Sequence, residues 1–212
     1  QRLVALCHQH DVALIEDDVY GDMGAGTGAI RPAKAFDLHG GVIHCGSLNK
    51  VLAPNLRVGW VVPGRWHRRV EMLHYTQTRR VAQWSQVVAA EFIGSSAFTR
   101  HLHKFRNLLN QQRTRLADAV AQHFPPGTRS SLPDGGMILW VELPGQVSSE
   151  ALFTRALAQG IKVAPGAIFS RNPKFAHFVR LACAQQHSRA VESAVRTLGA
   201  LTQQLLLESA RR

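Results

Sequence analysis

Short apolar runs alternate with helix-like periodic stretches along the first half of the chain. Apolar runs of strand length cover residues 12–17, 40–47 and 57–63. Apolar residues at helical spacing cover residues 1–10, 63–78 and 83–95. Strands of continuous apolar character that are joined by helices or long loops are typical of a parallel-type sheet covered on both faces. We therefore expect three buried strands, and Trp60 in the last of them is expected to be a core aromatic residue.

The second half begins with a long helix. It is predicted from Phe98 to His123, because its apolar residues are spaced for one face, and the segment FPPGT ends it. Strands are then predicted over residues 135–144, 162–166 and 178–184, and helices over residues 148–160 and 188–207. The pattern predicts an α/β chain in two parts, residues 1–95 and 96–212.

Composition narrows the classes of protein. The chain has 212 residues, of which 45% are hydrophobic, so it can bury a core and is not expected to be disordered. It has no apolar run long enough to span a membrane, and its first residues lack the features of a signal peptide. Cys7, Cys45 and Cys183 stand far apart, which favours reduced thiols in the cytoplasm over disulfides or a zinc site.

The formal net charge of +11 is unusual for such a chain. One basic cluster, Arg65, Arg68 and Arg69, lies in a predicted helix, and another surrounds Lys104 and Arg106. Such clusters could attract phosphates or nucleic acid, or they could be the solvated faces of two helices. No base-reading motif accompanies the charge, so the second interpretation is favoured.

Asp17 and Tyr20 are the first residues with candidate chemistry. Asp17 ends the first predicted strand, and open α/β sheets bind ligands at the carboxyl ends of their strands. Asp18 points to the opposite face, because neighbouring side chains of a strand alternate. An acid and a phenol three residues apart could bracket a heteroaromatic ring, with the acid keeping a ring nitrogen protonated. An acidic strand end that caps the next helix is the alternative.

The tetrad Ser47 to Lys50 follows the second predicted strand. Ser47 and Arg57 could hold a phosphate through a hydroxyl and a guanidinium group, and Lys50 could act as a nucleophile near that positive charge. An S-x-x-K tetrad also occurs in penicillin-recognising serine acylases, but the S-D-N and K-T-G segments that they require are absent from the sequence. A solvated lysine at a strand end is the plain alternative.

Five sequence blocks give a more specific indication. EDDVYGDM, CGSLNKVLAPNLRVGWVVPGR, PDGGMILWVELP, GIKVAPGAIFS and FVRLACA follow one another in the order and spacing of fold-type I aminotransferases. The chain most closely resembles the aminotransferase-like domain of MocR-type GntR transcriptional regulators, from about Arg2 to Leu206. The resemblance implies that residues 1–95 are the C-terminal part of a large, mostly parallel-sheet cofactor-binding domain. Residues 96–212 would be the small α+β domain.

The resemblance also implies a cofactor, pyridoxal 5'-phosphate, and roles for five residues around it. Lys50 would form a Schiff base with the cofactor and later act as the general base. Asp17 would pair with the ring nitrogen, and Tyr20 would hydrogen-bond the phenolic oxygen of the ring. Ser47 and Arg57 would bind the phosphate.

Arg180, in the last predicted strand, would bind the carboxylate of a substrate in bidentate fashion. An exposed strand-end arginine is the alternative. Gly135 and Gly136 would let the backbone pass close to the site, or would simply form a tight turn. No metal site is expected, because His101 and His103 are two residues apart on a helix and do not share a face.

Two function classes follow from the resemblance. The chain could transaminate an amino acid as a stand-alone aminotransferase, or it could bind an amino-acid or amine ligand as the sensing part of a regulator. The phrases LAPNLRVGWVVPGRW and APGAIFS favour the regulator. The family also implies a homodimer, and a winged-helix domain upstream of residue 1 through which alone DNA would be bound. A two-lobed α/β protein without a cofactor is the third hypothesis.

Overall fold

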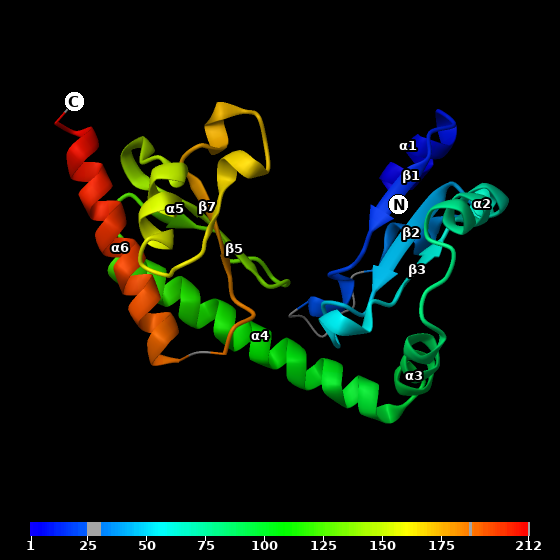
Figure 1. The fold of residues 1–212 in the computed structure, drawn as a ribbon. Helices are drawn as coiled ribbons and strands as arrows, with labels where there is room; N and C mark the ends of the chain where they lie inside the picture. The colour runs from blue at the N-terminus through cyan, green and yellow to red at the C-terminus, as the bar shows by residue number, and fades with distance from the viewer. Residues whose placement is uncertain (25–30, 187, 212) are drawn as a thin grey trace. The chain divides into compact units, whose positions relative to one another are not determined.

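The computed structural model describes residues 1–24, 31–186 and 188–211 (Figure 1). The chain forms two compact units, Gln1–Arg106 and Asn107–Arg212. The division falls inside the long helix α4 (Ser96–His123), which agrees with the helix predicted there. The sequence-based boundary at residue 96 stands at the first residue of this helix, and the compact units divide further along it.

The first unit is built on a three-stranded sheet with the order β1-β2-β3. Helix α1 (Arg2–Gln9) leads into β1 (Leu14–Asp17), and β1 pairs in parallel with β2 (Val42–Ser47). Between these strands lie two short 3₁₀ turns, η1 (Gly21–Met23) and η2 (Ala33–Phe36). Residues 25–30, in the glycine-rich segment between the turns, lie outside the described part of the chain.

The third strand differs from the prediction in direction and in burial. β3 (Gly59–Val62) runs antiparallel to β2, because the short connection that contains η3 (Pro54–Leu56) cannot make the crossover that parallel pairing needs. All four of its residues are exposed, and Trp60 has 41% of its surface exposed. The predictions of a buried third strand and a core Trp60 are therefore wrong. The prediction of a buried first strand is wrong as well, because β1 contains no buried residue and Ile15 has 69% of its surface exposed. β3 is an edge strand of this sheet, and apolar composition alone does not bury an edge.

Helices complete the first unit after β3. The turn η4 (Gly64–Trp66) leads into α2 (His67–Gln77), α3 (Gln83–Ile93) follows, and the unit ends in the first part of α4. These helices agree with those predicted from the apolar spacing. None of the helices formed by the described residues has the length and apolar character that crossing a membrane requires.

The second unit packs an antiparallel sheet against helices. Its strands β4 (Arg129–Ser130), β5 (Ile138–Glu142), β6 (Ala164–Pro165) and β7 (Phe178–Ala182) have the order β4-β5-β7-β6. Its helices are α5 (Ser149–Leu157) and α6 (Arg189–Ser209). It also contains the short 3₁₀ turns η5 (Pro144–Gln146), η6 (Gly166–Ile168) and η7 (Pro173–Phe175). The two-residue strand β4 has no counterpart among the predicted strands.

Alternation along β5 and β7 places the core of this unit. Leu139 and Val141 on β5, and Val179 and Leu181 on β7, are buried, whereas the residues between them are partly exposed. The buried side chains join those of α5 and α6 in one hydrophobic cluster. The chain therefore combines a parallel strand pair in one unit with an antiparallel sheet in the other, and the predicted α/β class is confirmed.

Candidate functional site

The parallel pairing of β1 and β2 brings their carboxyl ends to one edge of the sheet. Asp17 ends β1 and lies opposite Cys45 of β2 in the ladder, so these two side chains leave the sheet on the same face. Ser47 stands two residues beyond Cys45 and shares that face. The acid and the hydroxyl that the sequence singled out are therefore brought to the same edge and the same face of the sheet.

The side chain of Asp17 is solvent-exposed at this edge. Its carboxylate accepts a hydrogen bond of 3.3 Å from the backbone N–H of Val19, which shapes the turn after the strand. Burial and the nearby negative charge of Asp17 raise the pKa of the Cys45 thiol. Tyr20 follows at the start of η1, and 38% of its surface is exposed. Acid and phenol are thus both accessible from solvent.

Ser47 connects the end of β2 with the segment that precedes β3. Its hydroxyl accepts a hydrogen bond of 3.1 Å from the N–H of Asn49 and donates one of 3.4 Å to the carbonyl of Val58. The N–H of Leu48 donates to the same carbonyl over 3.1 Å. Because Val58 follows Arg57 directly, these bonds hold the serine and the backbone of the predicted phosphate-binding arginine in one loop.

Arg57 has an unusual backbone conformation. Its φ of 53° and ψ of 36° lie in the left-handed region, which residues other than glycine seldom adopt. A residue held in this region costs about 1–3 kcal/mol, and such residues cluster at ligand sites. The exposed side chain of Arg57 and its strained backbone are consistent with an anion-binding role.

Lys50 is an exposed residue in a turn that two buried residues anchor. Leu48 and Val51 have 1% and 2% of their surface exposed, so they anchor the turn, whereas the Lys50 side chain is exposed. The ring nitrogen Nε2 of His101 lies 2.7 Å from the carbonyl oxygen of Val51 and ties α4 to this turn. No sequence pattern indicates this role, because the contact spans fifty residues and the spacing marks His101 only as a basic or metal-binding residue.

The opposite face of β1 carries a different set of charged groups. The Glu16 carboxylate accepts hydrogen bonds of 2.6 Å and 3.0 Å from the N–H groups of Ala33 and Lys34, and it lies 3.2 Å from Nδ1 of His44. Although burial opposes it, these bonds lower the pKa of Glu16. Burial raises the pKa of Asp18. Glu16 therefore fixes the segment after the undescribed residues 25–30, and it is not on the face of Asp17.

In the second unit, Arg180 lies in the middle of β7, on the partly exposed face of the sheet, opposite Trp140 of β5. Gly136, before β5, has a φ of 78° that favours glycine, and its carbonyl accepts a 3.2 Å hydrogen bond from the buried Arg113. Arg113 is a further residue that sequence reasoning missed. It holds the turn that leads into the strand beside Arg180.

The basic clusters are partly engaged in contacts of the fold. Arg65 pairs with Asp11 over 2.6 Å and stacks on Trp66, and Arg106 donates to the carbonyl of Asp22 over 2.6 Å. These contacts favour the interpretation of the clusters as structural helix faces. Within the described ranges, no group of three or more histidine, cysteine, aspartate or glutamate residues could hold a metal ion.

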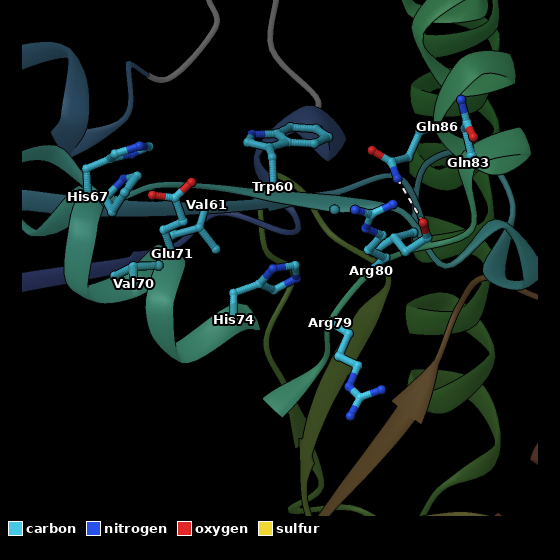
Figure 2. Close-up of a pocket in the computed structure, with 13 residues that line it drawn as sticks. Trp60, Val61, His67, Val70, Glu71, His74, Arg79, Arg80, Gln83 and Gln86 are labelled. Carbon is cyan, nitrogen blue, oxygen red and sulfur yellow. Dashed lines mark hydrogen bonds between the residues drawn. The ribbon is translucent and has the colours of Figure 1, made fainter. Parts of the chain in front are cut away.

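A cavity of about 730 Å³ lies elsewhere in the first unit (Figure 2). It is bounded by β3, which includes Trp60, by His67, Glu71 and His74 of α2, and by residues 79–86, which reach into α3. None of the residues predicted for the cofactor lines it, and we assign it no part in the candidate site.

The residues at the edge of the first sheet suit the chemical groups of pyridoxal phosphate. The exposed acid Asp17 is suited to a protonated ring nitrogen, and the Arg57 guanidinium and Ser47 hydroxyl are suited to a phosphate. One buried oxygen, Oδ1 of Asn49, which is the residue before Lys50, has no hydrogen-bond partner among the described residues. The donor set present therefore fits the cofactor that the sequence implies.

The chain resembles both regulators and aminotransferases in sequence. It is 35% identical over 205 residues to the uncharacterized HTH-type transcriptional regulator YdcR of Escherichia coli (strain K12), a match that covers 97% of this chain and 44% of that protein. It is 29% identical over 178 residues to aromatic-amino-acid aminotransferase 1 of Thermococcus litoralis, which covers 84% of this chain and 42% of that enzyme. The chain thus spans less than half the length of these relatives.

The fold resembles solved aminotransferases. The crystal structure of LysN, the alpha-aminoadipate aminotransferase of Thermus thermophilus, matches with a TM-score of 0.88 and 27% identity, over 97% of this chain and 54% of that one. That structure holds N-(5'-phosphopyridoxyl)-L-leucine. Residues 1–198 of the present chain match the family model described as aminotransferase class I and II. The chain therefore belongs to the class I and II aminotransferase family, and membership supports pyridoxal 5'-phosphate as its cofactor.

Proposed function

We propose that this chain is the pyridoxal-phosphate-binding, aminotransferase-like part of a MocR/GntR-type transcriptional regulator. It forms a Schiff base with the cofactor at Lys50 and senses, or transaminates, an amino-acid or amine ligand. The observation that supports the proposal is the position of Asp17 and Ser47 on one face of the sheet, at the carboxyl ends of β1 and β2, with the Lys50 turn directly after Ser47. The resemblance to an HTH-type regulator over nearly the whole chain supports the regulatory context.

Each residue at this edge has a distinct task in the proposal. Asp17 holds a proton at the ring nitrogen, and bound pyridoxal phosphate then supplies an electron sink for carbanion chemistry. Tyr20 orients the ring through its hydroxyl. Ser47 donates a hydrogen bond to the phosphate, and Arg57 neutralises and positions it. Lys50 attaches the cofactor and, once released, moves the proton at the ligand's α-carbon.

By family resemblance, we propose Arg180, in the second unit, as the residue that binds the ligand's carboxylate. Its guanidinium group binds the α-carboxylate of the ligand, which fixes the orientation of the Cα–H bond. By family resemblance we also propose that the protein acts as a homodimer in the cytoplasm, and that it reaches DNA through a separate winged-helix domain.

Borohydride trapping tests the assignment of Lys50. The full-length protein is incubated with pyridoxal phosphate, reduced with borohydride, digested and mapped by mass spectrometry. We expect one phosphopyridoxyl label, on Lys50, and its loss in Lys50→Ala. Lys162→Ala, which removes another exposed lysine, is the matched control and should keep the label. A label on a different lysine, or none, contradicts the proposed function.

A stand-alone aminotransferase is the second candidate, and the resemblance to the Thermococcus litoralis enzyme favours it. The two candidates share the lysine chemistry but differ in output. A regulator changes its affinity for DNA when an amino acid is added, whereas an enzyme releases a keto acid over many turnovers. Measuring both outputs on the same preparation separates them.

A further inference from the structure

Arg180 lies on the open face of the sheet in the second unit. The residues before and after it, Val179 and Leu181, point into the core, so Arg180 points away from the core. Its neighbours across the ladder are Trp140 on β5 and Ala164 on β6. Directly opposed side chains in antiparallel strands share a face, so Trp140 stands beside the arginine.

The flat face of the Arg180 guanidinium group makes a cation–π contact with a phenylalanine ring. It lies over the ring of Phe169, with Cζ 4.9 Å from the ring centroid. Among the described residues, no carboxylate lies within ion-pairing distance of Arg180, and its side chain makes no hydrogen bond there. A cation–π contact uses the flat face of a guanidinium and leaves the N–H edge open. That edge is the one that binds a carboxylate in bidentate fashion.

Phe169 is itself held in place by its surroundings. It follows the turn η6, and its N–H donates to the carbonyl of Gly166 over 3.0 Å. A side chain at Gly166 would overlap the backbone carbonyl of Phe175, so this turn lies tightly against its neighbour. The ring of Trp140 meets Phe169 edge to face, with centroids 5.7 Å apart and an interplanar angle of 75°.

Burial does not account for Phe169. Its surface is 48% exposed, so it is not a core residue. Trp140 packs against two further rings: it stacks on Phe178, with centroids 5.5 Å apart, and makes an edge-to-face contact with Phe175. Phe169 therefore stands at the open end of an aromatic cluster, and its exposed side adjoins Arg180. A half-exposed aromatic ring that is fixed by a tight turn and lies against a guanidinium is better explained by that guanidinium than by core packing.

We propose that Phe169 is a positioning residue for Arg180: its ring holds the guanidinium flat, so that the N–H edge is ready for the α-carboxylate of an amino-acid ligand. The inference rests on the proposed function and extends it to a residue outside the predicted set. A free arginine side chain loses rotamer freedom when it binds, and a ring that fixes it beforehand reduces that loss.

The test compares ligands that differ only in the carboxylate. L-Leucine and 3-methylbutylamine are titrated into the cofactor-bound, full-length protein, and binding is followed by the visible absorbance of the cofactor. The measured quantity is the ratio of the two affinities. We expect Phe169→Leu to lower this ratio about two- to fivefold, the range that an exposed cation–π contact supports. The separate variant Phe169→Tyr keeps an aromatic ring at this position and should show the affinity ratio of the wild type.

Phe175→Leu is the matched control, because Phe175 belongs to the same aromatic cluster, whereas the cation–π contact of Arg180 in the described structure is with Phe169. It should leave the ratio unchanged even if it lowers the thermal midpoint. An unchanged ratio in Phe169→Leu, with a wild-type preference for L-leucine, overturns the inference and leaves the proposed function standing. If the wild type fails to prefer L-leucine, the role of Arg180 fails, and the inference fails with it. If the wild type shows no cofactor absorbance, the proposed function itself fails.

Discussion

At the scale of single residues, the buried carboxylate of Asp37 combines backbone hydrogen bonds with an ion pair. It accepts hydrogen bonds from the N–H groups of His39, Gly41 and Val42 and pairs with Lys34 over 2.9 Å, and its side chain is 2% exposed. Burial alone would raise the pKa of this group. The bonds from Lys34 and the backbone outweigh burial and hold the pKa of Asp37 well below its ordinary value. Asp37 thereby fixes the start of β2, the strand that ends at Ser47.

The lowered pKa predicts how stability depends on pH. The folded state prefers the charged form of Asp37. The contribution of this carboxylate to the free energy of unfolding is therefore fully present above its unfolded pKa of about 4. It is lost as the pH falls from there through the lowered pKa of the folded state. We expect Asp37→Asn to destabilise the protein by about 2 kcal/mol at pH 7, since charge-assisted hydrogen bonds are lost, and by less at pH 3. Urea unfolding at both pH values measures this. Asp118→Asn, at an exposed position of α4, is the control. A deficit of equal size at both pH values contradicts the prediction.

At the scale of elements, Gly199 determines how closely α6 packs in the second unit. A Cβ atom at this position would overlap the carbonyl oxygen of His123, the last residue of α4. Alanine is the better helix former by about 1 kcal/mol, but the overlap is with backbone, which cannot turn aside as a side chain can. We expect Gly199→Ala to lower the free energy of unfolding by about 1–3 kcal/mol, as measured by urea unfolding. As a control, Gln203→Ala, on the exposed side of α6, should leave the free energy of unfolding nearly unchanged. If Gly199→Ala instead raised the free energy of unfolding, the close packing of α6 against the end of α4 would be refuted.

The elements also show what the sequence could and could not predict. The apolar segment at residues 178–184 correctly predicted the strand that contains Arg180, because such a pattern is local information. Continuous apolar runs also predicted that β1 and β3 are buried, and this prediction failed, since the burial of a strand depends on what lies beside it. The contact of His101 with Val51, and that of Phe169 with Arg180, join segments that are distant in sequence or belong to different elements. No spacing rule brings such pairs together, so these residues escaped the motif-based assignment.

At the scale of the whole molecule, the two units differ in how much apolar surface they bury. The hydrophobic cluster of the described chain, which includes Leu139, Val179 and Leu201, lies entirely in the second unit. The first unit has scattered buried side chains such as Val42 and Leu48, while β3 is exposed throughout. A hydrogen-bonded amide exchanges with solvent only when the structure around it opens. The free energy of that opening is larger where more apolar surface is buried.

Hydrogen exchange of the 212-residue chain, followed by mass spectrometry, tests this difference. We expect amides of β5, β7 and α6 to exchange at least about tenfold more slowly than those of β3, a ratio that corresponds to about 1.4 kcal/mol of opening free energy. Peptides from β2, which is hydrogen-bonded on both sides in the same sheet, serve as the internal control and should fall between these limits. Equal protection of β3 and β7 would mean that the edge strand is covered in solution, and the unequal distribution of stability argued from burial would then be wrong.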